Sequence, residues 1–248
     1  MQWKELEDYD WFPKILRQFQ VEAIGYFVHI LGLYKPVVSK VNELIHAHHI
    51  THMVDLCSGS GLPSLYIHKQ LSHKVKLLLT DKYPQAIPNL NQGITYLNTP
   101  VDVLSVTIQP NTLYTMYNAF HHFTYAQKQS IITHFASCNA VLVIVEIVQP
   151  TIQHAISVIL ASTVLQLIVA PCIKPFSWLR LLYTYIIPIN IITVLYDGVI
   201  SVCKSKSVHW YRNFFNIFTT NTYAISTNSI YIQGTPILVI TAAPIPTI

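Results

Sequence analysis

The sequence has few charged residues. Only 10% of its 248 residues are Asp, Glu, Lys or Arg, whereas about 25% is usual in soluble domains, and 52% are hydrophobic. Such a chain is too apolar for an ordinary water-exposed surface, which predicts a lipid-facing or oligomeric patch. The net charge of +4 comes without a cluster of Lys and Arg. This argues against a groove that binds nucleic acid.

Cysteine pairs are also missing. The four cysteines lie far apart and form no CxxC motif: Cys57, Cys138, Cys172 and Cys203. The chain therefore offers neither a zinc site of the usual spacing nor a disulfide framework, as is typical of a reducing compartment. The acidic N-terminal stretch MQWKELEDYDWF lacks the apolar core of a signal peptide. We expect a protein on the cytoplasmic side.

The hydrophobic pattern predicts an α/β protein. Apolar residues recur at helical spacing over residues 11–46, with a second helix starting at Pro36. Short apolar runs then alternate with helical segments, which is typical of a parallel sheet covered on both faces. The expected strands are 53–57, 76–81, 93–98, 113–120 and 139–148, and the expected helices between them are 62–71 and 125–137.

The C-terminal part of the chain again shows the alternating hydrophobicity that is typical of strands. Residues 222–233 and 237–244 alternate in hydrophobicity and flank a turn at Gly234, Thr235 and Pro236. This pattern predicts an antiparallel hairpin.

A glycine-spaced turn follows the first expected strand in MVDLCSGSGLPSL (53–65). No Lys-Ser or Lys-Thr pair comes after its glycines, so it is not a P-loop, and no third glycine completes a dinucleotide fingerprint. Asp55 precedes the turn, and Gly59 and Gly61 let the backbone approach a ligand closely. Asp81 closes the next strand, near the topological switch point, where it can accept both hydroxyls of a ribose. The pattern suits a nucleoside with a charged amino-acid tail.

These residues resemble the motifs of the class I S-adenosylmethionine-dependent methyltransferases. DLCSGSG (55–61) is similar to the family's D/E-x-G-x-G-x-G motif, with Cys57 at the first glycine. A small residue is expected to suffice there if its backbone dihedrals are ordinary. Thr80 and Asp81 resemble the ribose-binding acid, and Asp102 resembles the group that meets the adenine amine. NAFHH (118–122) is similar to the segment that faces methionine and substrate.

The resemblance covers about residues 50–150 and the terminal hairpin. Within the family, the chain resembles an uncharacterised bacterial group with an apolar insertion after strand five. The resemblance implies a Rossmann-like sheet, mostly parallel with a C-terminal antiparallel hairpin, plus N-terminal helices and an apolar helical insertion. It implies S-adenosyl-L-methionine as cofactor. The expected cofactor-binding residues are Asp55, Cys57, Ser58, Gly59, Gly61, Asp81, Lys82, Asp102 and Asn118.

Catalytic candidates lie just past the fourth expected strand and at the end of the fifth. Methyl transfer is an in-line displacement, and a hydroxyl or ammonium acceptor must also lose a proton. His121, His122 and Glu146 are the candidates for this step. Their alternative roles are packing for one histidine and a capped or salt-bridged side chain for Glu146. The expected substrate-pocket residues are aromatic or acidic: Tyr9, Trp11, Tyr117, Tyr183 and Asp197.

The run HAHHITH (46–52) is rich in histidine. His48 and His52 are four residues apart, but Ile50 and Thr51 are expected to break the helix that would align them. The run contains no carboxylate or cysteine to complete a metal site. We interpret it as a solvated helix end, where imidazolium suits the helix dipole, and predict no metal site.

Residues 151–203 form an apolar insertion of two segments. The first, 151–173, has no charged residue and approaches the length of a membrane span. The second, 181–203, is interrupted by Pro188 and contains Asp197, which needs a partner if it is buried.

A spanning hairpin would carry Lys174 and Arg180 to the far side of the membrane, against the positive-inside tendency. We therefore favour a hairpin that lies in the interface or dips into one leaflet. A true span, and a protein-buried cap or homodimer interface, stay open. The expected domains are an N-terminal helical cap (1–50), a cofactor domain (51–150 and 204–248) and the insertion (151–203).

The sequence favours an S-adenosylmethionine-dependent methyltransferase with an amphiphilic or apolar small-molecule acceptor, associated with a membrane surface. One alternative is a membrane-anchored interaction protein that keeps a degenerate methyltransferase fold. Another, a protein or RNA methyltransferase, fits less well because no basic groove and no Asn/Asp-Pro-Pro-aromatic motif are present.

Overall fold

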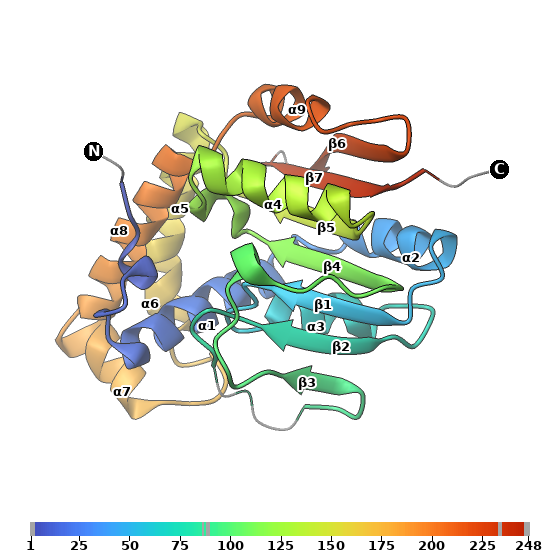
Figure 1. The fold of residues 1–248 in the computed structure, drawn as a ribbon. Coiled ribbons are helices and arrows are strands. Elements are labelled where there is room, and N and C mark those ends of the chain that lie inside the picture. The colour runs from blue at the N-terminus through green and yellow to red at the C-terminus, as the bar shows by residue number, and fades with distance from the viewer. Residues whose placement is uncertain (1–2, 86, 88–89, 233–234, 246–248) are drawn as a thin grey trace.

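Seven strands form one sheet at the centre of the molecule (Figure 1). The structure is a computed structural model, and it describes residues 3–85, 87, 90–232 and 235–245. The strand order is β3-β2-β1-β4-β5-β7-β6. The strands are β1 (His52–Leu56), β2 (Lys76–Thr80), β3 (Ile94–Tyr96), β4 (Thr112–Tyr117), β5 (Val141–Glu146), β6 (Tyr223–Ile232) and β7 (Thr235–Pro244).

The first five strands are parallel, and β7 pairs antiparallel with both β5 and β6. Every residue of β4 and β5 is buried, as expected for central strands covered on both faces. The predicted fold class is therefore confirmed: a Rossmann-like sheet, mostly parallel, with a C-terminal antiparallel hairpin. Of the turn expected at 234–236, Gly234 lies outside the described residues, and Thr235 and Pro236 already belong to β7.

Helices cover both faces of the sheet. One hydrophobic cluster joins the sheet to α2 (Val37–Ala47) and α3 (Leu62–Lys69). A second cluster, on other side chains of the same strands, joins it to α4 (Tyr125–Ser137) and α9 (Val208–Asn216). The sequence analysis did not predict α9. A helix α1 (Lys14–Ile30) leads into α2, so the helical part expected over 11–46 begins three residues later than expected.

The insertion folds as two long helical segments. The first runs through α5 (Ile152–Leu160), the π-helical turn η4 (Ala161–Leu165) and α6 (Gln166–Val169). The second runs through α7 (Trp178–Leu181), the π-helical turn η5 (Leu182–Ile186) and α8 (Ile189–Lys204). It bends by 78° between η5 and α8, at the expected interruption around Pro188.

The insertion lies at the edge of the sheet to which the arrowheads of β1, β2 and β4 point (Figure 1). The N-terminal segment with the 3-10 turn η1 (Leu6–Asp8) lies beside it, and α8 contacts both η1 and η3 (Phe120–His122). The edge where an open α/β sheet binds its ligands is therefore covered by the N-terminal segment and by the insertion.

Candidate functional site

The glycine-spaced turn connects β1 to α3 at the carboxyl edge of the sheet. Gly59 and Gly61 have φ of +51° and +69°, a conformation that glycine adopts without steric cost. A Cβ at Gly61 would lie 2.9 Å from Leu79 Cδ1, so the turn also packs against β2. Ser58 joins the two strands: its N–H donates to Thr80 O at 2.9 Å, and its Oγ accepts from Thr80 N at 3.0 Å. The turn is thus held in one conformation before any ligand arrives.

The backbone of Cys57 differs from the expectation drawn from the sequence. A small residue was expected to be tolerated there if its backbone dihedrals were ordinary, but Cys57 has φ of +56°. A residue with a Cβ costs roughly 1–2 kcal/mol in this left-handed region. Cys57 therefore occupies a backbone conformation that favours glycine. Burial raises the pKa of its thiol well above the usual value, which favours the neutral form.

Asp81 follows β2 and faces the turn. Its Oδ2 accepts from Gly59 N at 2.8 Å, and its Oδ1 accepts from Tyr83 N at 2.7 Å. Burial raises the pKa of this carboxyl above its usual value. Each carboxylate oxygen has a second lone pair, so the group can still accept two further hydrogen bonds.

Two other predicted cofactor residues lie near the same edge. Lys82 is exposed, with its Nζ 3.9 Å from Asp10 Oδ1. Asp102 is exposed after β3 and caps the 3-10 turn η2 (Val103–Ser105) by accepting from Leu104 N at 2.9 Å. An open hollow lies beside β3, lined by Ile87, Leu90, Ile94, Thr95, Tyr96, Asn98 and Pro175.

Asp55 lies beneath the turn within β1. It is 2% exposed, and its Oδ1 accepts from Thr115 Oγ1 on the neighbouring strand β4 at 2.7 Å. Burial raises its pKa to about 7. The side chain therefore supports the turn from below.

Asn118 connects the carboxyl ends of β4 and β5. Its φ is +51°, its N–H donates to Val145 O at 2.6 Å, and its Oδ1 accepts from Ile147 N at 3.3 Å. Asparagine tolerates the left-handed region better than most residues, which explains its position at this sharp exit from the sheet. The turn aims η3, with both candidate histidines, across the end of β5.

His121 and Glu146 form a buried pair. His121 Nδ1 is 2.6 Å from Glu146 Oε2, and both side chains are 0% exposed. Glu146 Oε1 also accepts from Phe120 N at 2.7 Å and from His121 N at 3.2 Å. Burial opposes the charge on Glu146, but the neighbouring His121 outweighs it and lowers the pKa of the carboxyl. His121 Nε2 is buried and has no hydrogen-bond partner among the described residues.

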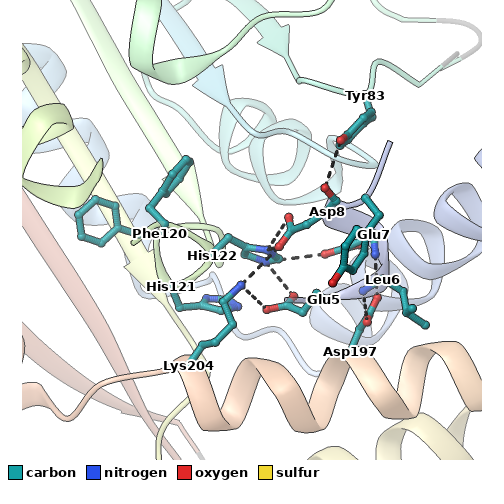
Figure 2. A network of polar contacts seen from close by, with 12 residues as sticks. Glu5, Leu6, Glu7, Asp8, Tyr83, Phe120, His121, His122, Asp197 and Lys204 are labelled. Atoms are coloured by element: carbon teal, nitrogen blue, oxygen red, sulfur yellow. Dashed lines mark hydrogen bonds and ion pairs between the residues drawn. The ribbon is translucent and has the colours of Figure 1, made fainter. Parts of the chain in front are cut away.

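His122 faces the acidic N-terminal segment (Figure 2). Its Nδ1 is 3.1 Å from Asp8 Oδ1, and its Nε2 is 3.2 Å from Glu5 Oε2 and 3.7 Å from Glu7 Oε1. Burial alone would lower the pKa of His122, but these carboxylates outweigh it and raise the pKa to about 10. This favours the imidazolium near neutral pH, which makes His122 a poor proton acceptor.

Asp197 holds the N-terminal segment in place. Its carboxylate accepts from Leu6 N at 2.6 Å, Glu7 N at 3.2 Å and Gln20 Nε2 at 3.0 Å. The partners that a buried acid needs are therefore present, although Asp197 was expected in a substrate pocket. Lys204 completes the attachment: its Nζ lies 3.0 Å from Glu5 Oε1 and 3.4 Å from Asp8 Oδ2.

The sequence analysis missed Glu5, Asp8 and Lys204 as parts of the site. The run ELEDYD near the N-terminus carried a signal, namely four acids in a chain that has few. Nothing local in the sequence, however, relates this run to histidines more than 110 residues away.

The four aromatic residues expected in the substrate pocket are dispersed. Tyr9 and Trp11 pack together, with ring centroids 5.5 Å apart, and Trp11 is 66% exposed. Tyr117 is buried against Tyr34, and its hydroxyl has no partner among the described residues. Tyr183 is half-buried in η5, within the insertion. The structure does not bring these side chains into one cluster.

The histidine-rich run behaves as a helix end. Helix α2 stops at Ala47, with His48 as its C-cap, and β1 starts at His52. The expected break of the helix is therefore confirmed. His46 packs against His73 of the following loop, with ring centroids 3.9 Å apart.

The insertion is inside-out with respect to an ordinary soluble helix pair. Seven of its buried residues are polar, namely Ser162, Gln166, Arg180, Thr184, Asn190, Thr193 and Asp197, and five are apolar, namely Val169, Ala170, Ile173, Val194 and Ile200. Its outer surface is largely apolar, including Ile152, Ile156, Ile168, Trp178, Ile186 and Ile192, which are 53–82% exposed. Within the described residues, Ile152–Val169 is long and apolar enough to cross a membrane, and the bent pair Trp178–Ile186 and Ile189–Lys204 passes the same test together.

Comparison with known proteins gives matches only among solved structures. No family model and no curated protein matches the chain. An O-methyltransferase family protein from Burkholderia thailandensis is 12% identical, with a TM-score of 0.46 over 86% of this chain and 57% of that one. Magnesium protoporphyrin IX methyltransferase from Synechocystis PCC 6803, with bound SAH, is 12% identical, with a TM-score of 0.45 over 85% and 83%.

PigF with SAH is 14% identical, with a TM-score of 0.48 over 95% of this chain and 62% of that one. The chain thus spans less than two thirds of the Burkholderia protein and of PigF. At these identities the likeness concerns the fold.

Proposed function

We propose that this protein is an S-adenosylmethionine-dependent methyltransferase that acts on an amphiphilic or apolar small molecule at a membrane surface. The observation that supports this best is the contact between Asp81 and Gly59 N–H at the carboxyl edge of β1 and β2. It unites an acid that can accept two ribose hydroxyls with a backbone turn that permits close approach. The antiparallel β7 between β5 and β6 is consistent with the same family.

The residues at this edge suit the cofactor. Asp81 keeps one lone pair on each oxygen for the ribose, and the turn from Ser58 to Gly61 is held to β2. The hollow beside Asn98 suits an adenine ring, with Asp102 close in sequence. S-adenosylmethionine supplies an electrophilic methyl group on a sulfonium. The acids of the N-terminal segment suit a ligand with positive charge.

In the proposed reaction, His121 takes up the proton that the methyl acceptor loses. Glu146 holds the imidazole of His121 in position. With Nδ1 held by Glu146, the Nε2 atom of His121 is the free end of the imidazole. A neutral Nε2 with a carboxylate on Nδ1 is the arrangement that makes histidine an effective base. Residues Glu5–Asp8 cover this end, so substrate entry requires that the N-terminal segment open.

The inverted polarity of the insertion supports the membrane part of the proposal. Exposed apolar side chains on α5, η4, η5 and α8 are costly in water and favourable in lipid, whereas the polar side chains face the protein. Trp178 and Tyr185 are exposed among them, and such amphipathic rings suit the headgroup region.

One ion pair favours a hairpin that lies in the interface. Arg180, near the tip of the insertion, is fully buried and contacts Glu22 of α1 through Nη1 and Oε2 at 2.5 Å. Its Nη2 donates to Ile173 O at 2.7 Å and to Pro175 O at 2.6 Å. The tip is therefore attached to the N-terminal helix, whereas a spanning hairpin would carry it across the bilayer.

Calorimetry with S-adenosylmethionine tests the cofactor part. Wild type should bind, and Asp81→Ala should bind about tenfold to a hundredfold more weakly, because hydrogen bonds to a carboxylate are worth about 1.5–3 kcal/mol. Glu43→Ala, at an exposed carboxylate of α2, is the matched control and should bind as wild type. Failure of the wild type to bind would favour the membrane-anchored interaction protein instead.

Flotation with vesicles tests the membrane part. The full chain should float with phosphatidylcholine vesicles that contain phosphatidylglycerol. The double variant with Ile156→Glu and Ile192→Glu should lose most of this binding. Ile217→Glu changes an equally exposed isoleucine outside the insertion and should not. A chain that forms a stable dimer and fails to float would point to an interface between copies.

A further inference from the structure

Three potential metal ligands converge where the N-terminal segment meets η3. Glu5, His121 and His122 each offer one ligand atom, and the three atoms lie within 4.8 Å of one another. Two of them are already close, with His122 Nε2 3.2 Å from Glu5 Oε2. Glu5 and His121 are 1% exposed, so the cluster lies in the interior of the protein and not on its surface.

One ligand atom in this cluster is left without a partner. His121 Nε2 is buried and accepts or donates no hydrogen bond among the described residues. A buried polar atom without a partner costs about 1–3 kcal/mol, so native structures rarely keep one without a purpose. A cation bound at this nitrogen would remove the cost.

Both histidines are held as metal-binding histidines usually are. His121 Nδ1 contacts the carboxylate of Glu146 at 2.6 Å, and His122 Nδ1 contacts that of Asp8 at 3.1 Å. Such a carboxylate on the far nitrogen fixes the tautomer and the ring orientation. Nε2 is then the nitrogen that faces the metal, and in His122 the cation displaces the proton that the surrounding carboxylates otherwise favour. The sequence offered no such pairing, because Asp8 and Glu146 lie far from the two histidines along the chain.

We propose that Glu5, His121 and His122 bind a divalent transition-metal cation, the histidines through Nε2 and Glu5 through its carboxylate. Two imidazoles and one carboxylate form the donor set of catalytic zinc and of non-haem iron(II) sites, which leave further positions open. This proposal replaces the sequence-based prediction that the chain has no metal site, a prediction that considered only the run 46–52.

The place of the cluster suggests what the cation does, and this step rests on the proposed methyl transfer. The ligands lie at the carboxyl ends of β4 and β5, where the acceptor is expected. A hydroxyl acceptor that coordinates the cation at an open position loses its proton to water more readily, because the metal lowers its pKa. The cation then takes the place of His121 Nε2 as the group that promotes deprotonation.

Lys204 competes with the cation. Its Nζ is 3.0 Å from Glu5 Oε1, so it supplies the positive charge that a metal would otherwise supply. This gives a variant whose effect on metal affinity differs between the two interpretations. If the cluster is only a salt-bridge network, Lys204→Met lowers stability and does not affect metal binding. If it is a metal site, the variant binds metal more tightly.

Binding of Co²⁺ to the untagged full chain, stripped with chelator, is the direct test. Wild type should bind one equivalent with the visible absorption of a four- or five-coordinate site, and Zn²⁺ should displace it. Glu5→Gln should weaken binding at least about tenfold, and Asp8→Asn about 10–100-fold, as is usual for outer-shell partners. Lys204→Met should tighten it about tenfold.

The surface histidines provide the matched control. A double variant with His49→Gln and His52→Gln alters the run 46–52, which could bind metal adventitiously, and should leave the single equivalent unchanged. The proposal would be overturned if this double variant lost Co²⁺ binding while Glu5→Gln kept it. It would also be overturned if the wild type bound no Co²⁺. Glu5→Gln is at the covering segment, and its circular dichroism spectrum verifies that it folds.

These measurements need no cofactor and no acceptor, so they separate the two proposals. Metal binding without S-adenosylmethionine binding would support the metal site and contradict the proposed methyltransferase activity. Binding of S-adenosylmethionine without metal binding would support the methyltransferase and contradict the metal site.

Discussion

The imidazole of His121 and the carboxylate of Glu146 meet at 2.6 Å with neither side chain exposed to solvent. The contact joins the 3-10 turn after β4 to the last residue of β5, so it fixes the geometry between two strand ends. Glu146 also accepts backbone N–H groups from Phe120 and His121. A single carboxylate thus orients the imidazole and the turn that carries it.

Glu146→Gln should lower the free energy of unfolding by about 1–3 kcal/mol, because an amide has only one oxygen to accept the three hydrogen bonds. Urea denaturation measures the change. The exposed Glu43→Gln should stay within about 0.5 kcal/mol of wild type. An unchanged midpoint in Glu146→Gln would mean that the pair is not formed as described.

Cys57→Val should destabilise the protein by about 2 kcal/mol, because a β-branched side chain is strongly disfavoured at positive φ. Cys57→Gly should not destabilise it, since glycine adopts φ of +56° freely. Thermal unfolding of the two variants beside wild type gives the comparison. Equal loss in both would show that the thiol contributes packing that outweighs the backbone cost.

Asp55 should make stability depend on pH. Burial raises its pKa from 3.8 to about 7, so between these values the folded state holds a proton that the unfolded state has lost. Its contribution to stability is therefore fully present below about pH 3.8, falls as pH rises towards 7 and is then constant.

Asp55→Asn should flatten this part of the profile, because an amide does not titrate. The groups that act on it are the hydroxyls of Thr115, Ser64 and Ser58 and the carboxylate of Asp81, and of these only Asp81 is an acid. Urea unfolding at several pH values, for wild type and variant, provides the test. Parallel profiles would show that Asp55 is ionised in the folded state.

Asp197→Ala should release the N-terminal segment. The carboxylate accepts from Leu6 N and Glu7 N, and without it these amides have no acceptor. Hydrogen exchange in the segment should accelerate. Asp102→Ala removes a comparable acceptor of a backbone amide at η2, and exchange near Leu6 should not change. Equal protection in the Asp197 variant would mean that Lys204 and His122 suffice to hold the segment.

Much of the sheet was predictable from local pattern. Buried parallel strands form continuous apolar runs, and the runs around Val54, Leu78 and Val143 locate three of them. Helix α4 was predicted over its observed bounds because the apolar spacing of 125–137 is helical, and Thr124 with Gln127 caps its start. Helix α9 was not predicted, because its aromatic residues form a cluster only when they pack against the sheet and α4.

The sequence by itself determined the order of the strands and of most helices along the chain, the glycine turn, the acid after β2 and the apolar character of the insertion. These features follow from the type and spacing of neighbouring residues. Only the tertiary structure decided that Glu5 and Asp8 lie against His122, that Asp197 holds the N-terminal segment and that Arg180 attaches the insertion to Glu22. The reason is distance along the chain. Each of these contacts joins residues more than 110 positions apart, and no local preference specifies which buried charge will meet which partner.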